Sequence, residues 1–198
     1  MKEILVLLVA FLIFVSGCIG GEEVKRVDNK QVLMIIAPEN FRDEEYFDTK
    51  QVLESYGAKV TTASSKSGSV RSMFGKTVNV ENSLSDIDVK KYDAVVFIGG
   101  SGAEVYFDNK YALKIAEDAY KNNKVVAAIC IAPVILANAG ILDGKKATVW
   151  DGEYVDKLEE GGATYTGESV TKDGKIITAN GPHAAKQFGI EIVKALNE

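Results

Sequence analysis

Apolar residues gather in short continuous runs along the chain, with helical patterns between them. Three of these runs span 31–37, 94–98 and 125–129. Apolar runs without alternation predict strands that are buried on both faces of a parallel sheet. Helical spacing lies between and after them, at 43–56, 109–122, 133–139, 153–160 and from about 184 to the chain end. This alternation predicts an α/β fold, a three-layer sandwich of an open, mostly parallel sheet with helices on both faces.

Weaker patterns fill in the remaining elements. Shorter strands are expected at 59–63, 77–80, 147–150, 164–165, 168–171 and 176–178. Residues 64–72 are polar and are expected to form a loop, and 82–91 a surface connection. Asp43 is expected to cap the first helix, because aspartate is a favoured N-cap residue.

The N-terminus carries a targeting pattern. Residues 4–15 form an uninterrupted apolar run, which is shorter than the ~20 residues of a membrane span but suits a signal segment. The Val-Ser-Gly that precedes Cys18 resembles a prokaryotic lipobox. We therefore predict a signal segment at 1–17, lipidation at Cys18 and a flexible linker at 18–30. The alternative is an uncleaved anchor with an incidental cysteine. Either way, the domain at 31–198 would be tethered to the cell membrane on its extracytoplasmic face.

Composition narrows the possible partners and cofactors. The chain has 198 residues, a formal charge of −5, two cysteines and one histidine. This length without the targeting segment suits one domain with a full core. No basic patch suggests a nucleic-acid partner. One histidine excludes a multi-histidine metal site, and no CxxC pair is present, so no metal site is expected.

The run at 125–129 ends in Cys130, and a helical pattern starts at once. Ala128 and Ala132 flank the cysteine two positions away on each side. This arrangement is that of a nucleophile elbow, in which a sharp strand-to-helix turn exposes the nucleophile. A helix N-terminus there would favour the thiolate. The alternative is a buried cysteine that acts as a small apolar residue.

Several other groups with catalytic potential are expected near this elbow. The turns at 37–45, 98–103, 130–131 and 179–183 all follow predicted strands, and Trp150 ends another. Ligand sites of open parallel sheets form at the carboxyl ends of the strands. We therefore expect one crevice with a thiol, carboxylates, glycine N–H donors, an indole and the only imidazole.

Further segments carry a family pattern: 33–37 with 41–45, 93–100, 128–130, 139–148 and 174–182. Together they resemble the ThiJ/PfpI family, which has the class I glutamine amidotransferase-like fold, a flavodoxin-like arrangement. The resemblance covers about residues 31–197. It implies that Cys130 is the reactive centre, that Glu45 hydrogen-bonds it, and that the backbone of the Gly99–Gly100 turn and of Ile131 forms an anion pocket. It also implies chemistry without a cofactor, and self-association as a dimer or hexamer.

The sequence departs from this family at two positions. Ile131 stands where protease-like members have the histidine after the cysteine, and Trp150 where many have a histidine or tyrosine. The missing Cys-His dyad argues against peptidase activity. His183 is the only remaining imidazole: it either pairs with Cys130 or is a surface residue in a helix's first turn. Asn180 is a further candidate hydrogen-bond donor.

Some candidate residues also have a structural interpretation. Glu45 is either a catalytic carboxyl group or one of several solvated carboxylates beside Asp43, Glu44 and Asp48. Trp150 either belongs to the core or lines the pocket.

Three functions follow from these residues. The first is attack of the Cys130 thiolate on a small carbonyl compound such as a 2-oxoaldehyde, with Glu45 moving the proton. The second is a redox-sensing or chaperone-like protein without turnover, in which Cys130 is oxidised to a sulfinate beside Glu45. The third, a peptidase, is disfavoured.

Overall fold

The structure is a computed structural model, and it describes residues 24–198. The predicted signal segment and the predicted lipidation site at Cys18 lie outside the described residues. Within residues 24–198, no helix is both long enough and apolar enough to cross a membrane.

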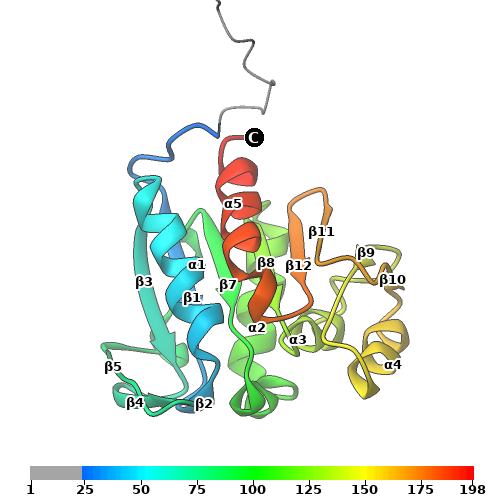
Figure 1. Cartoon of the computed structure of the whole chain (residues 1–198), viewed down its shortest axis with the longest axis horizontal. Helices are drawn as coiled ribbons and strands as arrows, with labels where there is room; N and C mark the ends of the chain where they lie inside the picture. The colour runs from blue at the N-terminus through cyan, green and yellow to red at the C-terminus, as the bar shows by residue number, and fades with distance from the viewer. Residues whose placement is uncertain (1–23) are drawn as a thin grey trace, which may run out of the picture.

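A seven-stranded sheet forms the centre of the molecule, in the order β11-β12-β8-β7-β1-β3-β6 (Figure 1). Every neighbouring pair is parallel except β11 and β12, which are antiparallel. The strands are β1 (Gln31–Ile35), β3 (Lys59–Ser64), β6 (Asn82–Ser83), β7 (Ala94–Phe97), β8 (Val125–Ile129), β11 (Val170–Asp173) and β12 (Ile176–Ala179). The predicted α/β fold with a mostly parallel sheet is confirmed.

Helices cover both faces of this sheet. On one face α1 (Asp43–Ser55) packs against α5 (Ala185–Leu196), as Figure 1 shows. On the other face α2 (Lys110–Lys121) and α3 (Pro133–Asn138) pack on β8 and on each other. With both faces covered, every residue of β7 and β8 is buried. This burial explains why their sequences are apolar throughout.

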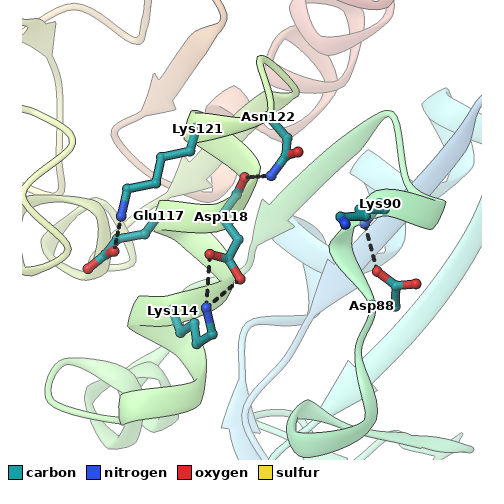
Figure 2. A network of polar contacts seen from close by, with 7 residues as sticks. All are labelled: Asp88, Lys90, Lys114, Glu117, Asp118, Lys121 and Asn122. Atoms are coloured by element: carbon teal, nitrogen blue, oxygen red, sulfur yellow. Dashed lines mark hydrogen bonds and ion pairs between the residues drawn. The ribbon is translucent and has the colours of Figure 1, made fainter.

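The solvent side of α2 carries ion pairs spaced four residues apart (Figure 2). Lys114 Nζ lies 2.8 Å from Asp118 Oδ2, and Lys121 Nζ lies 2.6 Å from Glu117 Oε2. Such exposed pairs contribute little, because water and salt screen them. The stability of α2 therefore comes from its buried face, which includes Ile115.

The prediction of a loop at residues 64–72 is wrong. There β4 (Gly68–Ser72) lies between β2 (Glu39–Phe41) and β5 (Thr77–Val80) in a small three-stranded sheet. Its polar composition hides a strand because alternate residues, Val70 and Ser72, are the buried ones.

The predicted strand 147–150 is also corrected. Strand β9 covers only Lys146–Ala147 and pairs with β10 (Thr164–Tyr165) in a separate two-stranded sheet beside β11 and β12. Trp150 therefore does not end a strand of the main sheet. It is placed by a hydrogen bond from its backbone N–H to the Cys130 carbonyl oxygen, at 2.8 Å.

Asp43 does not cap α1, contrary to prediction. The N-cap residue is Arg42, and no side chain caps this helix end. Asp43 lies buried in the first turn, where its carboxylate accepts hydrogen bonds from Ser72 Oγ at 2.8 Å and from the Phe74 N–H at 3.1 Å. Asp43 thus fixes the turn between β4 and β5 to the start of α1.

Residues 82–91, predicted as a surface connection, contain the short strand β6 and two 3-10 turns, Leu84–Asp86 and Val89–Lys91. The described part of the predicted linker, residues 24–30, packs on the domain (Figure 1). Val27 is buried, and its N–H donates to Tyr56 O at 2.8 Å. The packed unit therefore begins before residue 31.

Candidate active site

Cys130 lies in the sharp turn after β8, with α3 following at Pro133. Its φ is +64°, a left-handed backbone conformation that residues other than glycine rarely adopt. Two backbone hydrogen bonds hold this turn: the Cys130 N–H donates to Ala179 O, and the Trp150 N–H donates to Cys130 O, both at 2.8 Å. The geometry is that of a nucleophile elbow.

The glycine turn after β7 brings the other groups against this cysteine. A Cβ atom on Gly99 would lie 2.6 Å from Cys130 Cβ and 2.7 Å from Glu45 Oε2, so only glycine lets these residues meet. Gly100 has φ +91°, and a Cβ there would lie 2.4 Å from Arg42 N. Both positions therefore require glycine.

Glu45 projects from the first turn of α1 and is completely buried. Its Oε2 accepts the Gly99 N–H at 3.0 Å, while Oε1 has no nitrogen or oxygen partner among residues 24–198. Burial raises the pKa of Glu45 to about 7, although the neighbouring Cys130 and the Gly99 N–H oppose the rise. Near neutral pH this carboxyl group can therefore both accept and donate a proton.

Cys130 is 8% exposed, and its thiol is not poised as a thiolate. Burial first, and then the negative charge of Glu45, raise the pKa of Cys130 to about 12. The backbone N–H groups of Gly100 and Ile131 oppose this rise. The expectation that a helix N-terminus would favour the thiolate is thus corrected: burial and Glu45 outweigh the backbone donors. Ionisation of the thiol needs a nearby base.

These groups open into a cavity of about 280 Å³. Its walls include six of the predicted site residues: Glu45, Gly100, Cys130, Ile131, Trp150 and His183. Gly99 does not line the cavity, but its backbone N–H donates to Glu45 Oε2 and so positions the Glu45 carboxyl group. The expected crevice at the carboxyl edge of the sheet is therefore present.

Other wall residues were not singled out as site residues from the sequence: Arg42, Met73, Ser101, Tyr154 and Pro182. Tyr154 lies at the start of α4 (Glu153–Glu160), and its hydroxyl donates to Glu104 Oε1 at 2.8 Å. Burial and this hydrogen bond raise the pKa of Tyr154 to about 12, so the phenol stays protonated. No motif marks Tyr154, because its role depends on where α4 docks.

The remaining candidates are placed differently. His183 is exposed and lines the cavity, but between described residues it makes no hydrogen bond to the Cys130 thiol. Asn180 lines a neighbouring cavity of about 320 Å³, which shares Trp150 and His183 with the first. Trp150 is 45% exposed and therefore does not belong to the core.

Comparison with known proteins agrees with this geometry. The model of the DJ-1/PfpI family matches residues 30–195. The chain belongs to the DJ-1/PfpI family. A crystal structure of a ThiJ/PfpI domain protein from Brachyspira murdochii superposes with a TM-score of 0.83 at 34% identity, over 86% of this chain and 98% of that one.

Some relatives in this family are named as uncharacterized proteins and others as enzymes. An uncharacterized protein of Methanocaldococcus jannaschii is 41% identical over all of this chain and 98% of its own length. A deglycase of Pyrococcus abyssi is 30% identical over 83% of this chain and 98% of its own. A glutathione-independent glyoxalase of Caenorhabditis elegans is 27% identical over 84% of this chain and 89% of its own. The family therefore includes proteins named as deglycases and glyoxalases.

Proposed function

We propose that this protein is a cysteine-dependent enzyme that converts small carbonyl compounds, 2-oxoaldehydes foremost, as a glyoxalase or deglycase does. One observation carries the proposal: Cys130 lies in a nucleophile elbow against a buried carboxyl group whose pKa is about 7. A general base with a pKa near the working pH combines availability with strength. The names of the deglycase and glyoxalase relatives support the same chemistry.

The first step follows from the two pKa values. Because the thiol is protonated at neutral pH, Glu45 accepts its proton as the sulfur attacks the aldehyde carbon. A C–S bond forms and the carbonyl π bond becomes an oxyanion. The backbone N–H groups of Gly100 and Ile131 hydrogen-bond the Cys130 sulfur, so they lie where they can also stabilise the oxyanion. Protonation of the oxyanion by Glu45 gives a hemithioacetal.

The second step is a proton transfer within the bound adduct. Glu45 removes the C–H proton of the hemithioacetal carbon and returns it to the neighbouring carbonyl carbon, while the hydroxyl proton of the adduct passes to the neighbouring carbonyl oxygen. The product is a thioester of a 2-hydroxy acid. Water then hydrolyses the thioester, which releases the acid and restores the thiol. No external oxidant or reductant is needed, because one carbon is oxidised while its neighbour is reduced.

The decisive assay follows lactate formation from methylglyoxal without added thiol, with Cys130 kept reduced. We expect turnover by the wild type and none by Cys130→Ala or Glu45→Gln. His183→Ala serves as the control and should retain most of the turnover, because His183 does not hydrogen-bond the thiol. An inert wild type refutes the proposal, and an inert His183→Ala variant with unchanged stability would instead assign the base role to the Cys130–His183 pair.

We further propose that the domain is tethered to the membrane through lipid on Cys18. The support is the apolar run at 4–15 followed by the lipobox-like Val-Ser-Gly-Cys. Cell fractionation of wild type and Cys18→Ala tests it. The wild type should sediment with membranes, and Cys18→Ala should lose its lipid as seen by intact mass. A wild-type N-terminal peptide with the mass of its amino acids alone would contradict lipidation.

A second function, redox sensing, is favoured by a different feature of the same site. The Gly100 and Ile131 N–H groups act on the sulfur, and the buried Oε1 of Glu45 is free to donate when protonated. These donors would also hold the oxygens of a Cys130 sulfinate. Intact-mass measurement after mild peroxide should then show a stable gain of two oxygen atoms in the wild type and none in Cys130→Ala. An unmodified wild-type thiol would exclude this function.

A further inference from the structure

The loops at which the parallel strands begin form one end of the molecule, where the described chain starts and the C-terminus lies (Figure 1). This end, the amino edge, consists of residues 24–30, 56–59, 88–93, 121–124, 173–175 and 197–198. Backbone hydrogen bonds join its segments: the Lys59 N–H donates to Lys30 O at 2.8 Å, and the Val125 N–H donates to Asp93 O at 3.1 Å. Cys130 follows Val125 by the whole length of β8, about 16 Å at the rise of a strand. The amino edge and the cysteine cavity therefore lie at opposite ends of the sheet.

The amino edge is basic although the protein as a whole is acidic. Its segments contain nine lysines and arginines and five aspartates and glutamates, which gives a formal charge of +4. The other described residues contain thirteen basic and twenty acidic side chains, a formal charge of −7. The basic residues come from five separate segments, so the fold brings them together and no single stretch of sequence reveals the patch.

The positive charge of this edge is largely uncompensated. Four of its five acidic residues already form ion pairs: Asp28, Asp93, Asp173 and Glu198. Six lysines of the edge are at least partly exposed and have no carboxylate partner within residues 24–198: Lys25, Lys59, Lys90, Lys91, Lys124 and Lys175. A lysine near a surface of anionic lipids strengthens binding about fivefold. Several such lysines on one face therefore suit a membrane of that kind.

The described chain also enters the domain at this edge. Its first segment is fixed there, because Val27 is buried and Asn197 Nδ2 donates to Lys25 O at 3.1 Å. Cys18, the proposed lipidation site, precedes Val24 by six residues. Six residues span at most about 22 Å when fully extended. A tether of this length brings the amino edge to the membrane rather than the cysteine cavity.

We propose that the amino edge is a membrane-binding surface that contacts anionic lipid headgroups through its lysines. The tether holds the chain at the membrane, and the basic edge sets the orientation of the domain. Contact is needed for this, because electrostatic attraction reaches only about 8 Å at physiological salt. In this orientation the cysteine cavity opens toward water, so a dissolved substrate reaches Cys130 without crossing the lipid surface. The inference uses the proposed tether but not the proposed enzyme chemistry.

Lysine labelling of the full chain measures this contact directly. The protein is bound to vesicles of phosphatidylcholine alone or of an equal mixture with phosphatidylglycerol, and a water-soluble acylating reagent is added. Mass spectrometry then gives the labelling rate of each lysine. We expect labelling of the edge lysines to be about fivefold slower on the anionic vesicles, and this protection should vanish at 1 M salt, where electrostatic range falls to about 3 Å. Three exposed lysines near the carboxyl ends of the strands are internal controls and should react equally on both vesicles: Lys66, Lys110 and Lys186.

Two triple variants with the same change in net charge test the patch itself. Replacing Lys59, Lys90 and Lys91 with glutamine should restore fast labelling of Lys25 and Lys124 on anionic vesicles. Replacing the three control lysines with glutamine should leave that protection in place. Equal effects of the two triple variants overturn the inference.

The remaining outcomes separate this inference from its neighbours. Equal labelling of the edge on both vesicles, or protection of the control lysines instead, overturns it. Protection by duplex DNA without protection by vesicles also overturns it and assigns the edge to a nucleic acid. A protected edge on a chain whose mass shows no lipid at Cys18 leaves the inference standing and refutes lipidation alone. A lipidated chain with an unprotected edge overturns the inference alone.

Discussion

Replacing Glu45 with glutamine should change how the stability of the protein depends on pH. Glu45 is completely buried, and burial raises its pKa from an ordinary 4.5 to about 7. The folded state therefore binds this proton more tightly than the unfolded state does. Because the folded pKa is the higher one, the stabilisation is fully present below about pH 4.5 and is lost as the pH rises through about 7.

The size of the effect follows from the same two values. Between pH 5 and pH 8, linkage predicts that ionisation of Glu45 lowers the free energy of unfolding by about 2.5 kcal/mol. Glutamine keeps an acceptor for the Gly99 N–H but cannot ionise. Glu45→Gln should thus resemble the wild type at pH 5 and exceed it by about 2.5 kcal/mol at pH 8.

Urea unfolding of both proteins at pH 5, 6, 7 and 8 measures this difference. The matched control is Glu44→Gln, because Glu44 is the adjacent glutamate, is partly exposed and pairs with Arg42 at 2.7 Å. The pKa of Glu44 is lowered rather than raised, so its replacement should leave the wild-type slope between pH 5 and 8 in place. A Glu45→Gln variant whose stability falls with pH in parallel with the wild type would refute the reasoning.

Three further changes probe the surroundings of the site. Gly99→Ala should destabilise the fold by about 1–3 kcal/mol in urea unfolding, because its Cβ would overlap the cysteine side chain, and an unchanged midpoint would contradict this packing. Asp43→Ala removes the acceptor of the buried Ser72 hydroxyl and of the part-buried Phe74 N–H, so we expect a loss of about 1–3 kcal/mol and faster proteolysis near Met73; equal proteolysis rates would argue against that anchoring role. Tyr154→Phe frees a cavity wall from Glu104, so KM for methylglyoxal should rise a few-fold with kcat unchanged, and a fall in kcat alone would disprove a positioning role.

The central strands could be predicted from the sequence because burial on both faces leaves an unmistakable apolar run. Residues 94–97 and 125–129 are entirely buried in the structure, as their composition predicts. The polar strand β4 could not be found in this way. Only its alternate side chains, Val70 and Ser72, are buried, and the others are exposed or half-buried. So short an alternation does not differ from the pattern of a polar loop.

The same contrast applies to the site. The elbow at Cys130 was predictable because its sharp turn requires small residues on either side of the cysteine, and Ala128 and Ala132 stand there. Tyr154 was not, because its role depends on where α4 docks. The ionisation state of Cys130 was missed for another reason: it depends on burial and on Glu45, which lies 85 positions earlier in the chain.

The two hydrogen bonds on the backbone of Cys130 have a consequence for the order in which the protein matures. A left-handed residue of this kind costs about 1–3 kcal/mol unless its surroundings hold it. Its partners, Ala179 and Trp150, both come later in the chain. A nascent chain that ends before residue 179 contains the cysteine but cannot hold it in this turn. The nucleophile is therefore assembled only at the end of synthesis, and incomplete chains carry an ordinary thiol.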